Sequence, residues 1–280
     1  MKEQVSTSTQ DDATVAVVTG AAGGIGRVLA QALLEAGCDV VATSLGRDVA
    51  TLDPLVRFAA PGRRLVCVGA DLATGEGRAA VVDAVRRQFG GLTCLINNAG
   101  VGMSSIRADY HDRPVGCREV SAETLRRFLD INAHAPMALT LALLPFFTKC
   151  WGRIVAIGTS LNAMLRAGFL PYGMSKAALE SGCAILAREL DGSGITVNVI
   201  NPGGPVDTPM AVRGTPQDRH ALIPPRMLVP PVLWLASRAA DGVSGKRITA
   251  TRWNPASIGE ALTPIGWPQL AGDSLWRPSD

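Results

Sequence analysis

The sequence lacks the features that mark several large classes of protein. No apolar run in its 280 residues reaches the roughly 20 that would span a bilayer. Its net charge of +3 comes from interspersed residues without a long basic block, which argues against nucleic acid as a partner. Six cysteines form no Cys-x-x-Cys pair and the histidines are not clustered, so we expect no disulfides and no metal site.

The ends of the chain also lack the features of targeting segments and of further domains. Residues 1–12 are polar and resemble neither a secretory signal nor a transit peptide, so we expect a disordered tail and a cytoplasmic protein. No Pro-, Gly- or Ser-rich linker and no internal repeat divides the remainder. We therefore expect one domain over residues 13–251, followed by an irregular extension over residues 252–280.

What is present is an alternation of two hydrophobic patterns. Short β-branched runs are typical of strands buried on both faces, and longer amphipathic stretches between them favour helices. Strands are expected at 14–19, 39–44, 65–69, 92–96, 153–157, 194–200 and, as the last one, 246–250, and helices at 27–36, 77–89, 121–147, from 171 onward and at 232–236. This order predicts an α/β fold, a doubly wound parallel sheet with helices on both faces. Residues 204–231 show no strong hydrophobic periodicity, so we expect this segment to be a mobile loop that covers an active site.

A glycine-rich turn connects the first expected strand to the first expected helix. Its residues, Gly20-Ala-Ala-Gly-Gly-Ile-Gly26, permit a tight turn that a diphosphate can approach closely. The start of the following helix presents free N–H groups and the positive end of the helix dipole. A glycine-rich turn between a strand and a helix predicts a nucleotide-binding site.

A second candidate site lies between residues 159 and 176. Tyr172 and Lys176 are four residues apart, so they share one face of a helix. The ordinary pKa of tyrosine is about 10, and a neighbouring ammonium favours the phenolate and lowers that pKa. Ser160 can hydrogen-bond a substrate oxygen and hold it beside the phenol. Taken alone, the pair also fits an exposed helix surface, and a cofactor site elsewhere in the chain decides between the two interpretations.

Three motifs together resemble those of the short-chain dehydrogenase/reductase family. They are Thr19-Gly20-x-x-x-Gly24-x-Gly26, Asn97-Asn98-Ala99-Gly100 and Tyr172-x-x-x-Lys176. The resemblance implies a Rossmann-like, NAD(P)-dependent oxidoreductase that interconverts a carbonyl and a secondary alcohol by hydride transfer, with Tyr172 as general acid and base. It also implies a homodimer or homotetramer built from helices 121–147 and 171–190.

The resemblance assigns roles to individual residues of this sequence. The implied catalytic residues are Asn132, Ser160, Tyr172 and Lys176, with Asn132 bending its helix and anchoring a water that links Lys176 to solvent. The implied cofactor-binding residues are Gly20, Gly24, Ile25, Gly26, Ser44, Arg47, Asp71, Leu72, Asn98, Ala99, Gly100, Tyr172, Lys176, Pro202, Gly203 and Thr208.

The sequence departs from the family pattern at two places that bear on function. Ser44 stands at the end of the second strand, where NAD-binding members carry an acid, and Arg47 follows it, so we expect NADP in preference to NAD. Ser160 precedes Tyr172 by 12 residues, whereas the commoner spacing of 13 falls on Thr159. We expect Ser160 to be catalytic, because the pair 159–160 resembles the family's Ser-Ser pair.

The identity of the substrate is not evident from the sequence. Arg166, inside the shortened segment before Tyr172, is a candidate partner for an acidic group on the substrate, and Arg107, Arg113 and Arg118 are further candidates. A regulator that binds NAD(P) without turnover is the alternative function. An epimerase or dehydratase of the related extended group ranks last, because its first turn has a different glycine spacing.

Overall fold

The computed structural model describes residues 14–147, 151–212 and 222–266. The expected tail at residues 1–12 and the last 14 residues of the expected extension lie outside the described residues. Within the described part of the chain, no helix has the length and apolar character to cross a membrane.

A single eight-stranded sheet forms the centre of the molecule. Its order is β3-β2-β1-β4-β5-β6-β7-β8, and every neighbouring pair is parallel except β7 and β8. The strands are β1 (Val15–Val18), β2 (Asp39–Ser44), β3 (Leu65–Gly69), β4 (Cys94–Asn97), β5 (Gly152–Ile157), β6 (Ile195–Asn201), β7 (Lys246–Thr249) and β8 (Leu262–Pro264). Strands β2, β4 and β5 are buried along their whole length, as the β-branched runs predict. The predicted α/β fold with a doubly wound sheet is confirmed.

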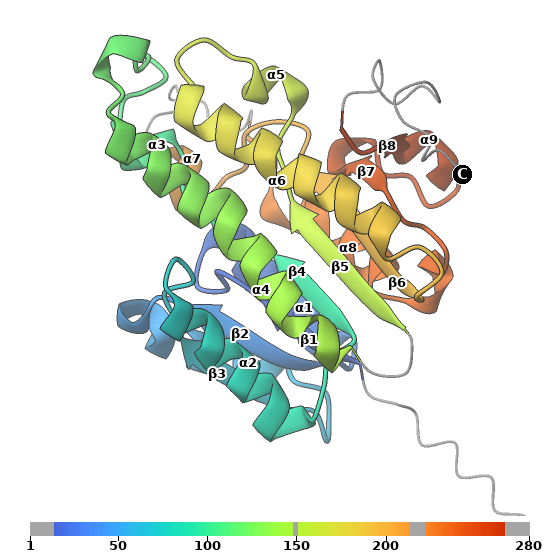
Figure 1. Ribbon diagram of the computed structural model, residues 1–280. Coiled ribbons are helices and arrows are strands. Elements are labelled where there is room, and N and C mark those ends of the chain that lie inside the picture. The colour runs from blue at the N-terminus through green and yellow to red at the C-terminus, as the bar shows by residue number, and fades with distance from the viewer. Residues whose placement is uncertain (1–13, 148–150, 213–221, 267–280) are drawn as a thin grey trace, which may run out of the picture.

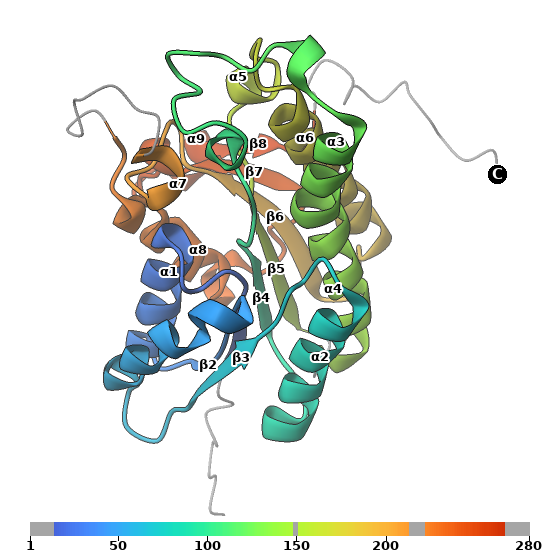
Figure 2. The ribbon, with the colours of Figure 1, turned by 90° about the vertical axis from the view of Figure 1, so that its left-hand side faces the viewer.

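Helices cover both faces of this sheet, as Figures 1 and 2 show from two directions. One face carries α1 (Gly24–Glu35), the 3-10 helix η1 (Gly46–Phe58) and α8 (Val229–Leu235). The other face carries α2 (Gly75–Phe89), the long helical segment with α3 (Ala122–Leu129) and α4 (Ala135–Leu143), and α6 (Leu170–Glu189). The short helices α5 (Leu161–Met164) and α7 (Pro209–Val212) lie together at one end of the sheet (Figure 2).

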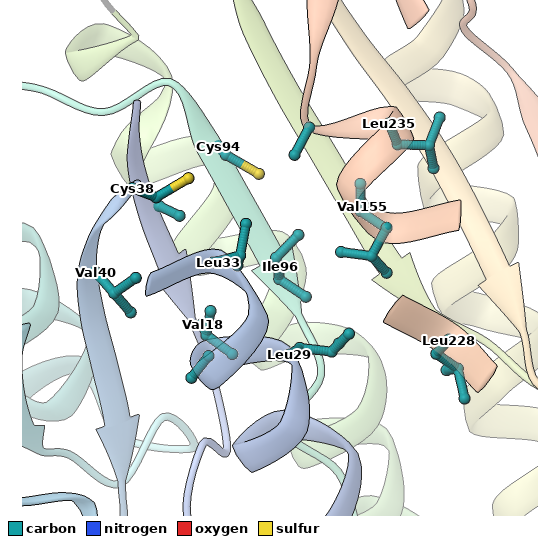
Figure 3. Packing of buried hydrophobic residues seen from close by; sticks show 14 of the residues in the cluster. Val18, Leu29, Leu33, Cys38, Val40, Cys94, Ile96, Val155, Leu228 and Leu235 are labelled. Atoms are coloured by element: carbon teal, nitrogen blue, oxygen red, sulfur yellow. The ribbon is translucent and has the colours of Figure 1, made fainter. Parts of the chain in front are cut away.

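The largest hydrophobic cluster fills the space between α1, α8 and the sheet (Figure 3). Leu29 and Leu33 of α1 and Leu235 of α8 point toward Ile96 and Val155, and all of these side chains are fully or almost fully buried. Cys38 and Cys94 lie in the same cluster. Burial raises the pKa of the Cys38 thiol to about 11, so these cysteines are small apolar side chains rather than nucleophiles.

The long predicted helix over 121–147 is interrupted in its middle. Residues Asp130–His134 form a π-helical turn between α3 and α4. Pro136 explains the interruption, because proline has no N–H to donate to the carbonyl of Asn132 four residues earlier, and its ring would collide with that carbonyl. Asn132 thus lies within a widened helical turn.

Several boundaries differ from those expected. Helix α1 begins at Gly24 rather than at residue 27, because the last glycines of the turn already adopt helical geometry. The expected loop over 204–231 contains α7, the 3-10 helix η7 (Pro225–Leu228) and the start of α8, whereas residues 213–221 lie outside the described part. The prediction that 246–250 is the last strand is wrong, because β8 pairs antiparallel with β7. The described part of the expected irregular extension thus adds helix α9 (Ile258–Ala261) and an edge strand to the sheet.

Candidate active site

A cavity of about 930 Å³ lies at the carboxyl ends of the parallel strands. Its wall is built from the segments that follow β1, β2, β3, β4, β5 and β6. From β1 the chain adds β2 and β3 toward one edge of the sheet, and from β4 it adds β5 and β6 toward the other edge. The direction of strand order therefore reverses between β1 and β4. Ligands of open α/β sheets bind at such a reversal.

The glycine-rich turn forms one side of this cavity. Gly20 has a φ of 65°, a left-handed conformation that favours glycine. A Cβ atom on Gly26 would collide with the Gly20 carbonyl and with the Asn98 side chain. Gly23 precedes α1 and no side chain caps the first N–H groups of that helix. The turn thus brings bare backbone and an uncapped helix start to the cavity wall, which is what binding of a diphosphate requires.

The segment after β4 holds the glycine-rich turn in place. The Thr19 hydroxyl accepts hydrogen bonds from the backbone N–H groups of Asn98 and Ala99, at 2.9 and 3.0 Å. The Asn98 side chain in turn donates to the carbonyl of Thr19 at 2.9 Å. Asn97 points to the other side and donates to the buried Thr140 hydroxyl at 3.0 Å. These bonds explain why two successive asparagines occur at this position.

Asn132 connects the same segment to helix α6. Its fully buried side chain accepts from the backbone N–H of Val101 at 2.8 Å and donates to the Val101 carbonyl and to the Ser175 hydroxyl, both at 3.0 Å. The side chain does not line the cavity. Asn132 thus positions the chain after β4 against α6.

Tyr172 and Lys176 lie in the cavity wall on α6, one turn apart. The Lys176 ammonium is buried and donates to the carbonyl of Ile157 at 2.8 Å. Burial lowers the pKa of Lys176 to about 8. The Tyr172 ring meets Phe169 edge-on, with 6.2 Å between the centroids. Sequence alone therefore correctly placed the pair on one helical face, and the structure shows that this face points into the cavity.

The expected effect of Lys176 on the Tyr172 pKa is not seen. Burial raises the pKa of the Tyr172 phenol, and a side-chain hydrogen bond with Thr159 offsets part of that rise. The physical reason is that the phenol lies among apolar and aromatic groups, where the charged form loses hydration. Lys176 meanwhile donates a hydrogen bond to the backbone carbonyl of Ile157.

The two hydroxyls before Tyr172 have different partners. The Ser160 hydroxyl accepts from the backbone N–H of Ala163 at 3.2 Å and caps the start of α5. The Thr159 side chain interacts with the Tyr172 phenol and opposes the rise in its pKa. Both residues line the cavity, so Thr159 is a second candidate beside the predicted Ser160. The N-cap bond uses a lone pair of the Ser160 oxygen and leaves its O–H free to donate, so substitution has to decide between the two hydroxyls.

A buried ion pair behind Thr159 was not foreseen. On β7, the Arg247 guanidinium donates to the Thr159 carbonyl at 2.6 Å and to the Glu180 carboxylate at 2.9 Å. The other Glu180 oxygen accepts from the backbone N–H of Gly266 at 3.2 Å. Both charged side chains are almost fully buried. The pair thus ties α6 and the edge of the sheet to the backbone of Thr159.

Most of the predicted site residues line the cavity. The exceptions are Gly26, Arg47, Asn132 and Gly203. Gly26 packs behind the turn, and Gly203, with a φ of 98°, faces Thr251. The Arg47 side chain is 77 % exposed and contacts Asp48 at 3.5 Å. Wall residues that the sequence analysis did not select include Arg27, Asp48, Thr159, Tyr110 and His111.

Arg27 is the wall cation near the end of β2. Its guanidinium donates to the carbonyl of Thr51 at 2.7 Å, which holds it beside η1 and the segment after Ser44. In the sequence, Arg27 could have been recognised as a candidate cofactor-binding residue because it directly follows Gly26, the last glycine of the turn. Among the described residues, no group of three or more His, Cys, Asp or Glu side chains is placed to hold a metal ion.

A bare glycine turn in one cavity of a doubly wound sheet is typical of a nucleotide-binding α/β protein, and here a phenol and an amine line the same cavity. Comparison with known proteins gives the same class. The sequence model of the short chain dehydrogenase family matches residues 14–219. The chain belongs to the short-chain dehydrogenase/reductase family, whose members are NAD(P)-dependent oxidoreductases.

Relatives and solved structures support this assignment. L-fucose dehydrogenase of Bos taurus is 31% identical over 193 residues, which are 68% of this chain and 65% of that protein. A short chain dehydrogenase from Burkholderia cenocepacia, solved in complex with NADP, superposes with a TM-score of 0.72 at 29% identity and covers 84% of this chain and 95% of its own. A 3-ketoacyl-(acyl-carrier-protein) reductase from Brucella melitensis, complexed with NADH, gives 0.70 at 26% identity, with the same coverage of 84% and 95%.

Proposed function

We propose that the protein interconverts a carbonyl compound and a secondary alcohol with a nicotinamide dinucleotide, and that Tyr172 is its general acid and base. The observation that carries the proposal is that Tyr172, Thr159 and Lys176 line the same cavity as the uncapped start of α1. A regulator that only binds NAD(P) has no use for a phenol, a hydroxyl and a buried amine at the far end of the nucleotide site. Turnover of reduced cofactor with a panel of ketones tests the proposal, and binding without any turnover would favour the regulator.

The residues present fit a dinucleotide along the whole cavity. The bare turn from Gly20 to Gly24 and the uncapped helix start suit the diphosphate. Ser44, Asp71 and Leu72 border the adenosine end, and Ala99, Gly100, Pro202 and Thr208 border the nicotinamide end. When bound, the nicotinamide supplies or accepts the hydride.

The chain's own residues manage the proton. Thr159 hydrogen-bonds the substrate oxygen and holds it beside Tyr172. In reduction the Tyr172 phenol gives its proton to that oxygen, and in oxidation the phenolate takes it back. Lys176 holds the nicotinamide ribose. The carbonyl of Asn132 cannot receive a helical N–H from Pro136, so it can accept from a water that passes protons to Lys176.

The two hydroxyls can be told apart by substitution. Thr159→Val removes the hydroxyl while keeping the branched shape, and it should lower kcat by about a hundredfold, since the group orients the reacting oxygen. Ser160→Ala should lose a helix cap, which costs about 1 kcal/mol of stability, while keeping most of its activity. Steady-state kinetics and thermal unfolding of both variants check this. A dead Ser160→Ala enzyme beside an active Thr159→Val enzyme would restore the original preference for Ser160.

NADP remains the expected cofactor, with Arg27 in place of Arg47 as the cation that meets the 2′-phosphate. Arg27 lines the cavity and Arg47 does not. Because a hydrogen bond to a charged group is worth roughly 1.5–3 kcal/mol, Arg27→Ala should reduce kcat/KM for NADPH by about tenfold or more and leave NADH little affected. Arg47→Ala is the matched control and should behave as wild type.

Asp48 lies in the same wall, and its carboxylate would repel the 2′-phosphate of NADP. Comparing turnover of NADPH and NADH by the wild-type enzyme therefore tests the NADP assignment. A wild-type enzyme that turns over NADH faster than NADPH would reject the NADP assignment. An equal loss in the Arg47→Ala control would reject the role of Arg27.

The surface supports assembly into a homodimer or homotetramer. Leu141 on α4 and Ile185 on α6, the two helices from which the assembly is expected to be built, are 56% and 53% exposed, and burial of both side chains against a second copy would favour assembly. Light scattering of the protein in solution tests this, and a monomer at micromolar concentration would contradict it.

A further inference from the structure

The two ends of the cavity differ in charge. The acidic residues of its wall, Asp48 and Asp71, follow β2 and β3 at the adenosine end. The other end is walled largely by apolar and aromatic side chains, among them Met103, Tyr110, Phe169 and Met210. The cations in that part of the wall are Lys176, which the mechanism uses, and Arg166, which it does not.

Arg166 is held at the substrate end by an aromatic ring. Its guanidinium carbon lies 4.9 Å from the centroid of Phe169, whose ring is the one that meets Tyr172 edge-on. Within residues 14–147, 151–212 and 222–266, Arg166 forms no ion pair with an acid. Its charge is felt by its neighbours, because it lowers the pKa of His111 and opposes the rise in the pKa of Tyr110.

His111 lies close enough to Arg166 to feel its charge, and its neutral imidazole can donate or accept a hydrogen bond. Its ring lies 4.1 Å from that of Tyr110, centroid to centroid, and lines the cavity. Burial and the charge of Arg166 together lower the pKa of His111, so the imidazole is uncharged at neutral pH. Its Nε2 is closed off from solvent and has no hydrogen-bond partner in the described part of the chain. A small rotation of the ring that let a ligand oxygen reach this nitrogen would recover the cost of leaving it unpaired.

Resting on the proposed function, we propose that the carbonyl or alcohol substrate carries a carboxylate that pairs with Arg166 and lies next to His111. One permanent cation and one neutral imidazole match a single negative charge better than the two charges of a phosphate. The planar guanidinium also suits a planar carboxylate, which it binds through two parallel hydrogen bonds.

The carboxylate is not adjacent to the reacting carbonyl. The guanidinium and the phenol each contact the ring of Phe169, and the charge of Arg166 acts on the pKa of Tyr110 and His111 rather than on that of Tyr172. A substrate that reaches both groups needs several bonds between its two ends, and the apolar wall formed by Met103 and Met210 accommodates a hydrocarbon spacer. A 2-oxo acid is too short to meet both.

The test uses straight-chain methyl ketones that end in a carboxylate, with one to five methylene groups between ketone and acid, each paired with its methyl ester. We expect the wild-type enzyme to prefer one of the longer acids over its ester by about tenfold in kcat/KM, with the difference mainly in KM. Arg166→Ala should remove this preference, so that kcat/KM for each acid falls to that of its own ester in the same variant. Arg113→Ala, an exposed arginine outside the cavity wall, is the control and should keep the preference.

The outcomes separate the two levels of the proposal. Equal turnover of acids and esters by the wild type, or a preference that survives in Arg166→Ala, would overturn the carboxylate assignment and leave the oxidoreductase function standing. A wild-type enzyme that reduces neither series, nor any other carbonyl compound tried, would instead count against the proposed function itself. His111→Phe should weaken the preference for the acid without raising the KM of the ester, and an unchanged preference would remove His111 from the site.

Discussion

Tyr172→Phe should reduce the rate of ketone reduction by about a thousandfold or more and leave cofactor affinity nearly unchanged. The substitution keeps the ring that packs edge-on against Phe169 and removes only the hydroxyl that hydrogen-bonds Thr159. A positioned general acid contributes roughly 10²–10⁴-fold, and hydride transfer to a ketone stalls when the oxygen receives no proton. Single-turnover oxidation of NADPH, with cofactor binding followed by fluorescence, measures the two effects separately.

Tyr110→Phe is the matched control for this variant. The chain has two tyrosines, and both line the cavity. The proposed mechanism uses the Tyr172 hydroxyl for proton transfer and gives the Tyr110 hydroxyl no role. Tyr110→Phe should therefore keep most of the activity. Turnover close to wild type in Tyr172→Phe would reject the assignment of the general acid, and loss of cofactor binding in that variant would show that the ring had moved.

The state of the phenol predicts opposite pH dependences for the two directions. Burial raises the pKa of Tyr172, so the phenol is protonated at neutral pH and ready to donate in reduction. Oxidation needs the phenolate, whose population grows as the pH rises toward that raised pKa. Reduction should therefore be sustained at neutral pH and fall under alkaline conditions, while oxidation should rise there.

Most strands were predictable because they are short runs rich in apolar or β-branched residues between helices. β2 and β3 match the expected bounds, and the buried pattern of β2 explains why the signal is strong. The 3-10 helix Gly46–Phe58 gave no such signal, since it mixes Pro54 with polar residues and buries only Leu52 and Leu55. Strand β8 is three residues long and ends in a proline, so no alternation of polar and apolar residues can reveal it.

The motifs were predictable as a set, but the role of each hydroxyl before Tyr172 was not. Spacing suggested either Thr159 or Ser160 as the hydroxyl beside Tyr172, and a comparison of residue pairs chose Ser160. The structure adds a helix of four residues, α5, whose start the Ser160 side chain caps, and an interaction of Thr159 with the Tyr172 phenol. A helix of four residues is too short to show hydrophobic periodicity, so neither its N-cap nor the partner of each hydroxyl could be predicted from the sequence.

The Arg247–Glu180 pair could not be predicted from the sequence for a different reason. The two residues are 67 positions apart, and isolated charges in a strand and a helix usually face water. In the fold they meet behind Thr159, nearly without exposure. The pKa of Glu180 is raised and that of Arg247 is lowered, in both cases mainly by burial, so desolvation outweighs their mutual attraction. Such a pair is a costly way to stabilise a protein, which points to a positioning role.

Arg247→Met should therefore lower both stability and activity. Removing one partner leaves the Glu180 carboxylate buried without its cation, which costs about 3–5 kcal/mol, and it releases the Thr159 carbonyl from its bond at 2.6 Å. The double variant Arg247→Met, Glu180→Leu replaces the pair by apolar side chains and should regain most or all of the lost stability. Its kcat should stay low, by about tenfold, because Thr159 remains unanchored.

Comparison of the single and double variants separates the two effects. Thermal unfolding reports stability, and kcat against KM for a ketone reports the orientation of Thr159, which should change kcat more than KM. Arg247→Lys keeps a donor near the Thr159 carbonyl and should recover part of kcat. If the stable double variant were as active as wild type, the pair would serve the fold alone, and the position of Thr159 would depend on the helix cap at Ser160 and the hydrogen bond to Tyr172.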